Sequence, residues 1–207
     1  MKLIKQSMIL SMIFLICSFN NRNPENPEKS TLFELFALAP ITLFDGTSEG
    51  ITIEEKKDLC IQKESDSWKI TYLTDEKMEV TCKYPSSSIT LFTLERKSKS
   101  PILVAFTVNE RNTSVELWEK DKGGNLEKVE LLPTVHAKDF FFIENQFDGL
   151  SKYNNNVYYS VDTEKFIIGA GLYTWMEKEF EFRPVDFQIE LKWDGEKFYP
   201  DKQVIVD

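Results

Sequence analysis

The chain has 207 residues with 34 Asp+Glu against 25 Lys+Arg, which gives a net charge of −9, and 42% of its residues are hydrophobic. This apolar content excludes an intrinsically disordered chain. The acidic balance argues against nucleic-acid binding, which needs an excess of Lys and Arg to replace phosphate counterions. One His and three Cys leave few residues for metal centres or thiol catalysis, so we expect no cofactor.

The chain begins with two cations, Lys2 and Lys5, followed by an uncharged apolar run from Met8 to Phe19. A run of about twelve residues is shorter than the roughly 20 that span a bilayer. A charged start and an apolar run of this length are typical of a secretory signal peptide. We therefore predict a signal peptide over residues 1–19 and export of the protein, with a buried N-terminal helix as the alternative.

Cys17 stands near the end of this apolar run and is followed by polar, proline-bearing sequence. This layout resembles the signal of bacterial lipoproteins, although the residue before the Cys, small in that family, is Ile16 here. The resemblance covers the N-terminal segment alone. It implies cleavage before Cys17, lipidation of that residue, and a membrane anchor at the cell envelope or outer surface; without acylation, the protein is simply secreted.

The next segment, residues 20–30, is rich in Asn, Glu and Pro, a composition that predicts a flexible tether. We expect residues 31–207 to form a single β-rich domain with a helical lead-in. Thr31 and Glu34 have the spacing of a capping box that opens a short apolar helix ending before Pro40, and core packing is its expected environment.

A second capping box, Thr52 with Glu55, predicts another short helix. Cys60 and Cys82 remain if Cys17 is acylated or removed. In an exported domain they are a candidate disulfide pair, worth about 3 kcal/mol through the unfolded state. The alternative is two buried thiols that pack as small hydrophobic groups.

Alternation of apolar and polar residues predicts strands from position 68 onward. Segments 68–72 and 78–84 form a hairpin around a turn at 74–76, which places Trp68 opposite Cys82. Further strands are predicted at Ile89–Arg96, Ile102–Val108, Val115–Glu119, Leu126–Leu132, Val157–Val161, Phe166–Trp175, Phe180–Phe182 and Val185–Trp193.

Two local features refine this assignment. Asp194 and Gly195 suit a two-residue type I′ turn, which would place Leu191 opposite Phe198. Gly169 and Gly171 lie inside a predicted strand, where glycine marks a bulge or a close backbone approach. The predicted fold is mainly β: an antiparallel sandwich, barrel or propeller-like meander with short N-terminal helices.

The sequence motifs for catalysis or metal binding are weak. His136 with Asp139 lacks the nucleophile turn of a Ser-His-Asp hydrolase, so a loop histidine is the expected reading. The oxygen-rich loops Asp45–Gly50 and Asp121–Asn125 lack the ligand order of an EF-hand. With 34 carboxylates in the chain, some acid pairs occur by chance at the spacing that glycoside hydrolysis requires, so such pairs do not identify a catalytic site. We assign no catalytic or metal-binding residue.

Aromatic residues are the remaining candidates for a binding surface. Trp118, Trp175, Trp193 and the run Phe140–Phe142 are candidate ligand contacts, with core packing as the alternative. The predicted function is an exported, lipid-anchored envelope protein whose β domain is structural or binds a protein or glycan without catalysis. The alternative is a secreted hydrolase that uses carboxylates or a calcium site.

Overall fold

Two antiparallel sheets make up most of the computed structural model, which describes residues 30–84, 87–97, 99–110, 112–140, 157–173 and 187–205. Sheet A has six strands in the order β1-β2-β3-β4-β5-β6, and sheet B has four in the order β10-β9-β8-β7. The strands are β1 Trp68–Leu73, β2 Lys77–Cys82, β3 Ser88–Leu94, β4 Ile102–Val108, β5 Thr113–Lys120, β6 Leu126–Val129, β7 Val157–Asp162, β8 Ile167–Leu172, β9 Phe187–Trp193 and β10 Phe198–Ile205.

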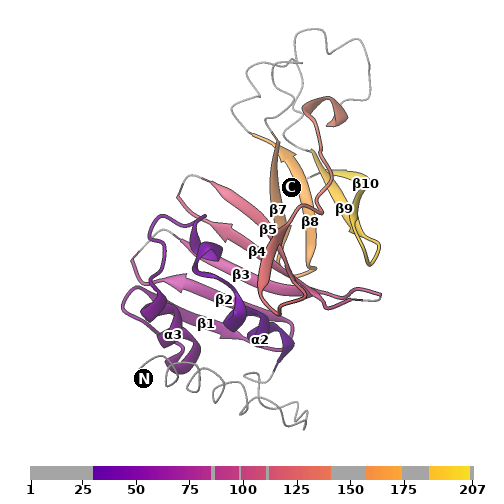
Figure 1. Cartoon of the computed structure of the whole chain (residues 1–207). Helices are drawn as coiled ribbons and strands as arrows, with labels where there is room; N and C mark the ends of the chain where they lie inside the picture. The colour runs from indigo at the N-terminus through magenta and orange to yellow at the C-terminus, as the bar shows by residue number, and fades with distance from the viewer. Residues whose placement is uncertain are drawn as a thin grey trace, which may run out of the picture.

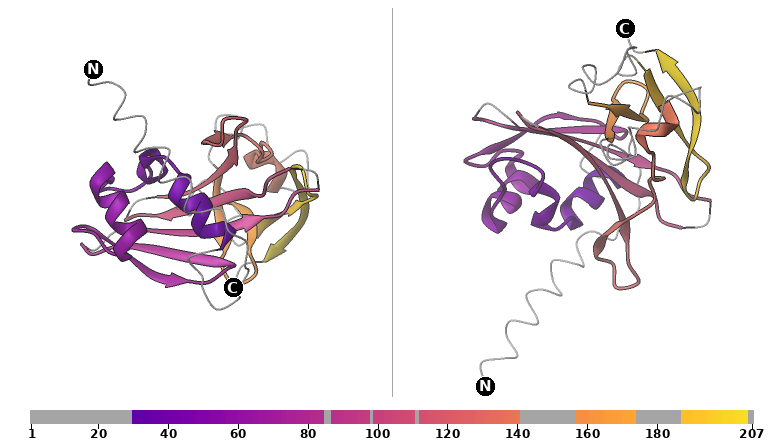
Figure 2. Two further views of the ribbon diagram at one scale, coloured as in Figure 1. Left: turned by 60° about the horizontal axis from the view of Figure 1, so that its bottom comes forward. Right: turned by 90° about the horizontal axis from the view of Figure 1, so that it is seen from above.

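The predicted class is confirmed: the fold is mainly β and sandwich-like, with short N-terminal helices. The helices are α2 Thr31–Leu38, α3 Ile53–Gln62 and two short 3-10 helices, η2 Ile41–Phe44 and η3 Ala137–Phe140. Figures 1 and 2 show α2 and α3 on one face of sheet A, while sheet B packs against the other face. The described strands do not close into a barrel.

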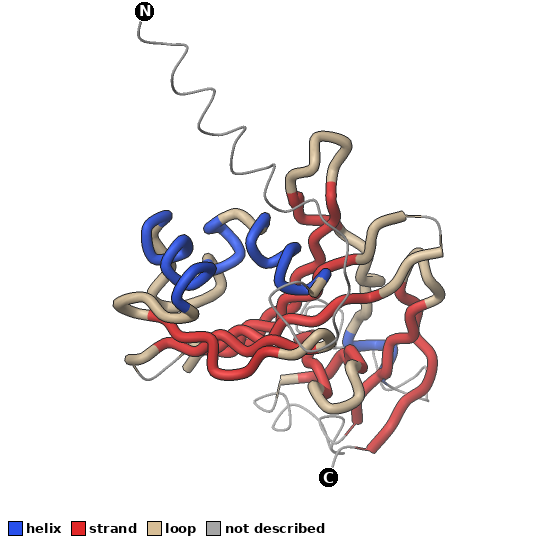
Figure 3. Tube along the Cα trace, turned by 90° about the horizontal axis from the view of Figure 1, so that it is seen from below, coloured by secondary structure: helices blue, strands red, loops and turns tan. Residues whose placement is uncertain are grey.

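Side chains from sheet A fill two separate cores, because successive residues of a strand point to opposite faces. The first core lies beneath the helices, which form one layer over the sheet in Figure 3. It is built from Leu32, Phe36, Leu43, Phe44, Leu59, Trp68, Met78, Val80, Ile89, Leu91, Leu103 and Trp118, among others. The second core lies between the sheets and includes Phe92, Ile102, Val104, Leu117, Ile168, Ala170, Leu172, Ile189 and Leu191.

Helix α2 is buried on the sheet, as its apolar sequence predicted. Its N-cap is Ser30 rather than the expected Thr31, because the Ser30 Oγ accepts a hydrogen bond from the amide of Phe33 at 3.1 Å. Its C-terminal carbonyls are satisfied by Lys56 of α3. The Lys56 ammonium donates to the carbonyls of Phe36 at 2.8 Å and Ala39 at 2.9 Å, and burial lowers the pKa of this amine.

The capping box of α3 is confirmed. The Thr52 hydroxyl accepts from the Glu55 amide, and the Glu55 carboxylate accepts from the Thr52 amide at 3.1 Å. The second carboxylate oxygen of Glu55 accepts from the amide of Ser67, also at 3.1 Å, just before β1. Burial raises the pKa of Glu55, but the hydrogen bonds from Ser67 and Thr52 outweigh it, and the pKa lies below its ordinary value of 4.5.

We expect Glu55 to make the stability of the protein fall in acid. A carboxyl whose pKa is depressed by folding stabilises the native state above its ordinary pKa, and this contribution is lost as the pH drops through the folded-state pKa. The free energy of unfolding is measured with urea at a series of pH values from about 5 to about 3. We expect it to fall less with decreasing pH for Glu55→Gln than for the wild type. The exposed neighbour Glu54 caps nothing in the structure, so Glu54→Gln should retain the full loss.

The N-terminal hairpin has the predicted pair of Trp68 opposite Cys82 and its loop at positions 74–76, but the register shifts between Ile70 and Tyr72, so that Leu73 lies opposite Met78. The hairpin of β5 and β6 also turns where expected, at Asp121–Asn125, with Lys120 opposite Leu126. Both loops are closed by their first polar side chain. The Thr74 hydroxyl accepts from the Lys77 amide at 3.0 Å, and the Asp121 carboxylate accepts from the Asn125 amide at 2.8 Å.

The predicted turn at the β9–β10 hairpin is wrong. The loop has four residues, 194–197, rather than two, and Trp193 rather than Leu191 lies opposite Phe198. The cause is the Asp194 carboxylate, which accepts from the amides of Glu196 at 2.8 Å and Lys197 at 2.9 Å and so stabilises the wider loop. Because the shift is an even number of residues as far as Pro200, the apolar face of this part of the hairpin is unchanged.

Candidate functional site

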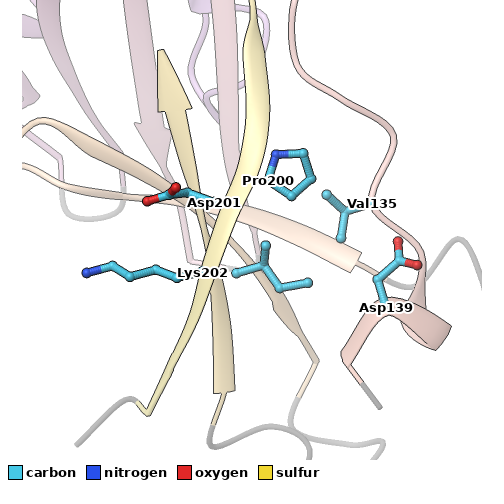
Figure 4. A pocket seen from close by; sticks show the side chains of 6 residues that line it. Val135, Asp139, Pro200, Asp201 and Lys202 are labelled. Atoms are coloured by element: carbon cyan, nitrogen blue, oxygen red, sulfur yellow. The ribbon is translucent and has the colours of Figure 1, made fainter. Parts of the chain in front are cut away.

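A hollow with a volume of about 370 Å³ lies beside the edge strand β10. Figure 4 shows it between β10 and the segment that leads into η3. Its lining consists of Val135, Asp139, Ile189, Pro200, Asp201 and Lys202.

An irregularity in β10 creates this hollow. Pro200 has no amide hydrogen to donate, and the register of β10 against β9 shifts between Pro200 and Lys202 so that Asp201 is a bulge. At the start of the strand, the Phe198 amide donates to the Leu131 carbonyl at 3.3 Å, which holds the segment after β6 beside this edge. Beyond Pro200 the strand and that segment diverge, and the space between them is the hollow.

The chain on the other side of the hollow is fixed by two polar side chains. The Tyr159 hydroxyl of β7 donates to the carbonyl of Pro133 at 2.6 Å, and burial raises the pKa of this phenol. The Asp139 carboxylate accepts from the amide of His136 at 2.8 Å and so caps η3. Asp139 and His136 are therefore paired through a backbone amide, as a structural cap rather than as a catalytic pair.

The hollow offers apolar contact and one carboxylate. Val135 and Ile189 are buried beneath it, and Asp139 lies at its rim. In Figure 4 the side chains of Asp201 and Lys202 point away from Asp139, to the other side of β10. The Lys202 ammonium is paired with Glu190 at 3.0 Å. This arrangement is suited to holding a small apolar group next to a hydrogen-bond donor.

The predicted aromatic contacts that the structure describes do not share one surface. Trp118 is 4% exposed and packs in the core beneath the helices. Trp193 packs on Phe198, with ring centroids 4.9 Å apart, and its Nε1 donates to the Glu95 carbonyl at 2.8 Å. Phe140 is buried in the core between the sheets. Trp175, Phe141 and Phe142 lie outside the described residues.

The three cysteines were predicted to carry modifications. Cys17 lies outside the described residues. Cys60 on α3 and Cys82 on β2 are free thiols in the structure, the former half-buried and the latter buried. Burial raises the pKa of both thiols, which makes them poor nucleophiles at neutral pH. The disulfide between them stays a prediction.

Within the described ranges, no cluster of three or more His, Cys, Asp or Glu side chains is placed to hold a metal ion.

One charged cluster was not visible in the sequence. Arg96, in the loop after β3, binds two carboxylates from different parts of the chain, Glu119 of β5 and Glu196 of the β9–β10 loop. No local sequence signal predicts this cluster, because its members are distant along the chain.

The outer face of sheet B contains the two strand glycines, which were expected to mark a bulge or a close backbone approach. A Cβ added to Gly171 would lie 2.7 Å from the ring of Tyr158, and one added to Gly169 would lie 3.0 Å from the Gln188 side-chain oxygen. Both glycines are buried under these side chains. The groups that approach these glycines are side chains rather than the backbone that was predicted, and the pairing of β8 with β7 has no bulge at either position.

We expect alanine to be tolerated unequally at these two positions. Gly171→Ala should destabilise the protein by about 1–2 kcal/mol, because the new Cβ would force the Tyr158 ring to move. That ring also packs on the ring of Tyr173, with centroids 5.3 Å apart. Gly169→Ala should cost much less, since the end of the flexible Gln188 side chain can turn aside. Guanidinium unfolding of both variants measures the difference, and an equal cost would show that the tyrosine ring does not pack as described.

Comparison with known proteins adds no assignment: no protein-family model, curated protein or solved structure matches the chain. Among the described helices, none is long and apolar enough to cross a membrane.

Proposed function

We propose that this protein is exported, anchored to the membrane by a lipid on Cys17, and displays a β domain that binds a protein or glycan ligand without catalysis. The observation that carries the proposal is the order of segments in the N-terminal sequence. A charged start, an uncharged apolar run, Cys17 and a polar segment follow one another, and the first described helix then begins at Thr31 with Ser30 as its N-cap.

The hollow beside β10 supports a binding role for the domain. It combines a buried apolar floor with the Asp139 carboxylate, which is held in place by the η3 cap. Its two acids, Asp139 and Asp201, point to opposite sides of the strand in Figure 4. The two carboxylates of a glycosidase instead face each other across the scissile bond, so the hollow favours binding over the alternative of a hydrolase.

Labelling with radioactive palmitate tests the anchor in a bacterial host that produces the full chain. We expect label on the wild type and none on Cys17→Ser. Cys60→Ser is the matched control, because it removes a cysteine of the folded body and should retain the label. Label that persists on Cys17→Ser, or a wild type that never acquires label, would overturn the proposed anchor.

A further inference from the structure

The outer side of the helical layer exposes aliphatic side chains that the fold leaves unburied. Ile53 and Ile61, both on α3, are 69% and 66% exposed. Eight residues of an α-helix advance by about 80° net around the axis, so both side chains lie on one outward side of α3, with the exposed Lys57 between them. Leu38 and Ile41 are each more than a third exposed at the corner between α2 and η2.

The contacts of Lys56 place this corner next to the N-terminal half of α3. Its ammonium reaches the carbonyls of both Phe36 and Ala39, and Ile53 precedes it by almost one turn. Leu38 and Ile41 therefore flank the same end of α3 as Ile53. We call Leu38, Ile41, Ile53 and Ile61 the aliphatic face of the helical layer.

The length of chain before α2 limits how far this face lies from the proposed anchor. Even fully extended, the residues between Cys17 and Ser30 span at most roughly 45 Å. A lipid on Cys17 thus confines the helical layer to the vicinity of the bilayer, at a high effective concentration. Under this condition, a few aliphatic side chains suffice to hold a surface at the interface, although they would not bind a membrane alone.

We propose that the aliphatic face docks on the surface of the bilayer that holds the lipid anchor; this inference rests on the proposed anchor at Cys17. The charge of the helical layer indicates which lipid headgroups it can approach. On these two helices the exposed Glu34 and Glu54 and the half-buried Asp58 outnumber the exposed Lys57, and this acidic excess is repelled by anionic headgroups. The docking surface is therefore a zwitterionic one, with α3 lying along it and sheet B turned away.

Brominated lipids test this orientation, since bromine quenches tryptophan emission at short range. The lipidated full chain is placed in phosphatidylcholine vesicles, and each variant is compared with the wild type to subtract the native tryptophans. We expect bromolipid to reduce the added emission of Ile61→Trp. Lys69→Trp, an exposed position on the face of sheet A opposite the helices, is the matched control and should lose none.

A second variant separates docking from tethering. Adding Ile53→Asp to Ile61→Trp should abolish the quenching while palmitate label on Cys17 persists, because the new charge opposes contact at the first helical position without breaking α3. Label with no quenching of Ile61→Trp overturns the docking alone. Emission that instead shifts with protein concentration assigns the face to a second copy and also overturns it. A wild type without label overturns both the anchor and the docking.

Discussion

Trp68→Ala is expected to lower the free energy of unfolding by about 3–5 kcal/mol, the usual cost of removing a large buried aromatic side chain. Trp68 is fully buried at the start of β1. Its ring meets Phe44 edge-on with centroids 5.0 Å apart, and its Nε1 donates to the Gly50 carbonyl at 2.8 Å. The side chain therefore joins sheet A to η2 and to the loop that precedes α3.

Chemical denaturation of Trp68→Ala measures this cost. Trp68→Phe separates the contribution of the buried ring from that of the hydrogen bond to Gly50. Phenylalanine keeps most of the buried ring and loses the hydrogen bond to Gly50, so we expect a loss of about 1–2 kcal/mol. Because whole domains are stable by only about 5–15 kcal/mol, the alanine variant should be close to unfolded in mild denaturant. A loss below about 1 kcal/mol for Trp68→Ala would contradict the packing of the helical layer described above.

Arg96→Ala should also be strongly destabilising, by about 2–4 kcal/mol. The Arg96 side chain is 4% exposed and pairs with Glu119 and, at 3.2 Å, with Glu196. Burial opposes its charge, yet the hydrogen bonds to Glu119 and Glu196 raise its pKa. Removing the guanidinium leaves both carboxylates without their shared cation and frees the β9–β10 loop from sheet A. The expected cost lies below that of a fully buried pair because both carboxylates reach solvent.

Two further variants examine the ion pairs of Arg96 with Glu119 of sheet A and with Glu196 of the β9–β10 loop. Glu196→Gln should cost less than about 1 kcal/mol, since this carboxylate is 43% exposed. Arg96→Lys should recover only part of the stability, because a single ammonium does not reproduce the forked donors of arginine. Equal unfolding midpoints for Arg96→Ala and the wild type would show that the two sheets are held together without this cluster.

Local sequence signals predicted the elements of the fold well. Apolar patterning predicted the described strands, whereas the predicted strand Phe180–Phe182 lies outside the described residues. The pair of Trp68 and Cys82 was also predicted, although a register shift between Ile70 and Tyr72, and not the loop alone, produces it. The spacing of Thr52 and Glu55 predicted the start of α3. Each of these predictions depends on groups a few residues apart, whose interactions are determined by backbone geometry.

The features that depend on distant residues could not be predicted. Lys56 closes the end of α2 from another helix, and Arg96 joins two carboxylates that neighbour it only in the fold. The β9–β10 loop was misjudged because Asp194 can cap a wider loop as well as open a tight turn. The hollow also depends on such contacts, since it needs both the bulge at Asp201 and the chain held beside Phe198.

The most direct test of the account is the intact mass of the protein recovered from the membrane fraction of cells that produce the full chain. Export and lipid anchoring at Cys17 predict a chain that lacks residues 1–16 and carries acyl chains at its new N-terminus. A chain that keeps residue 1, or one that begins at another position without a lipid, would contradict the proposed function.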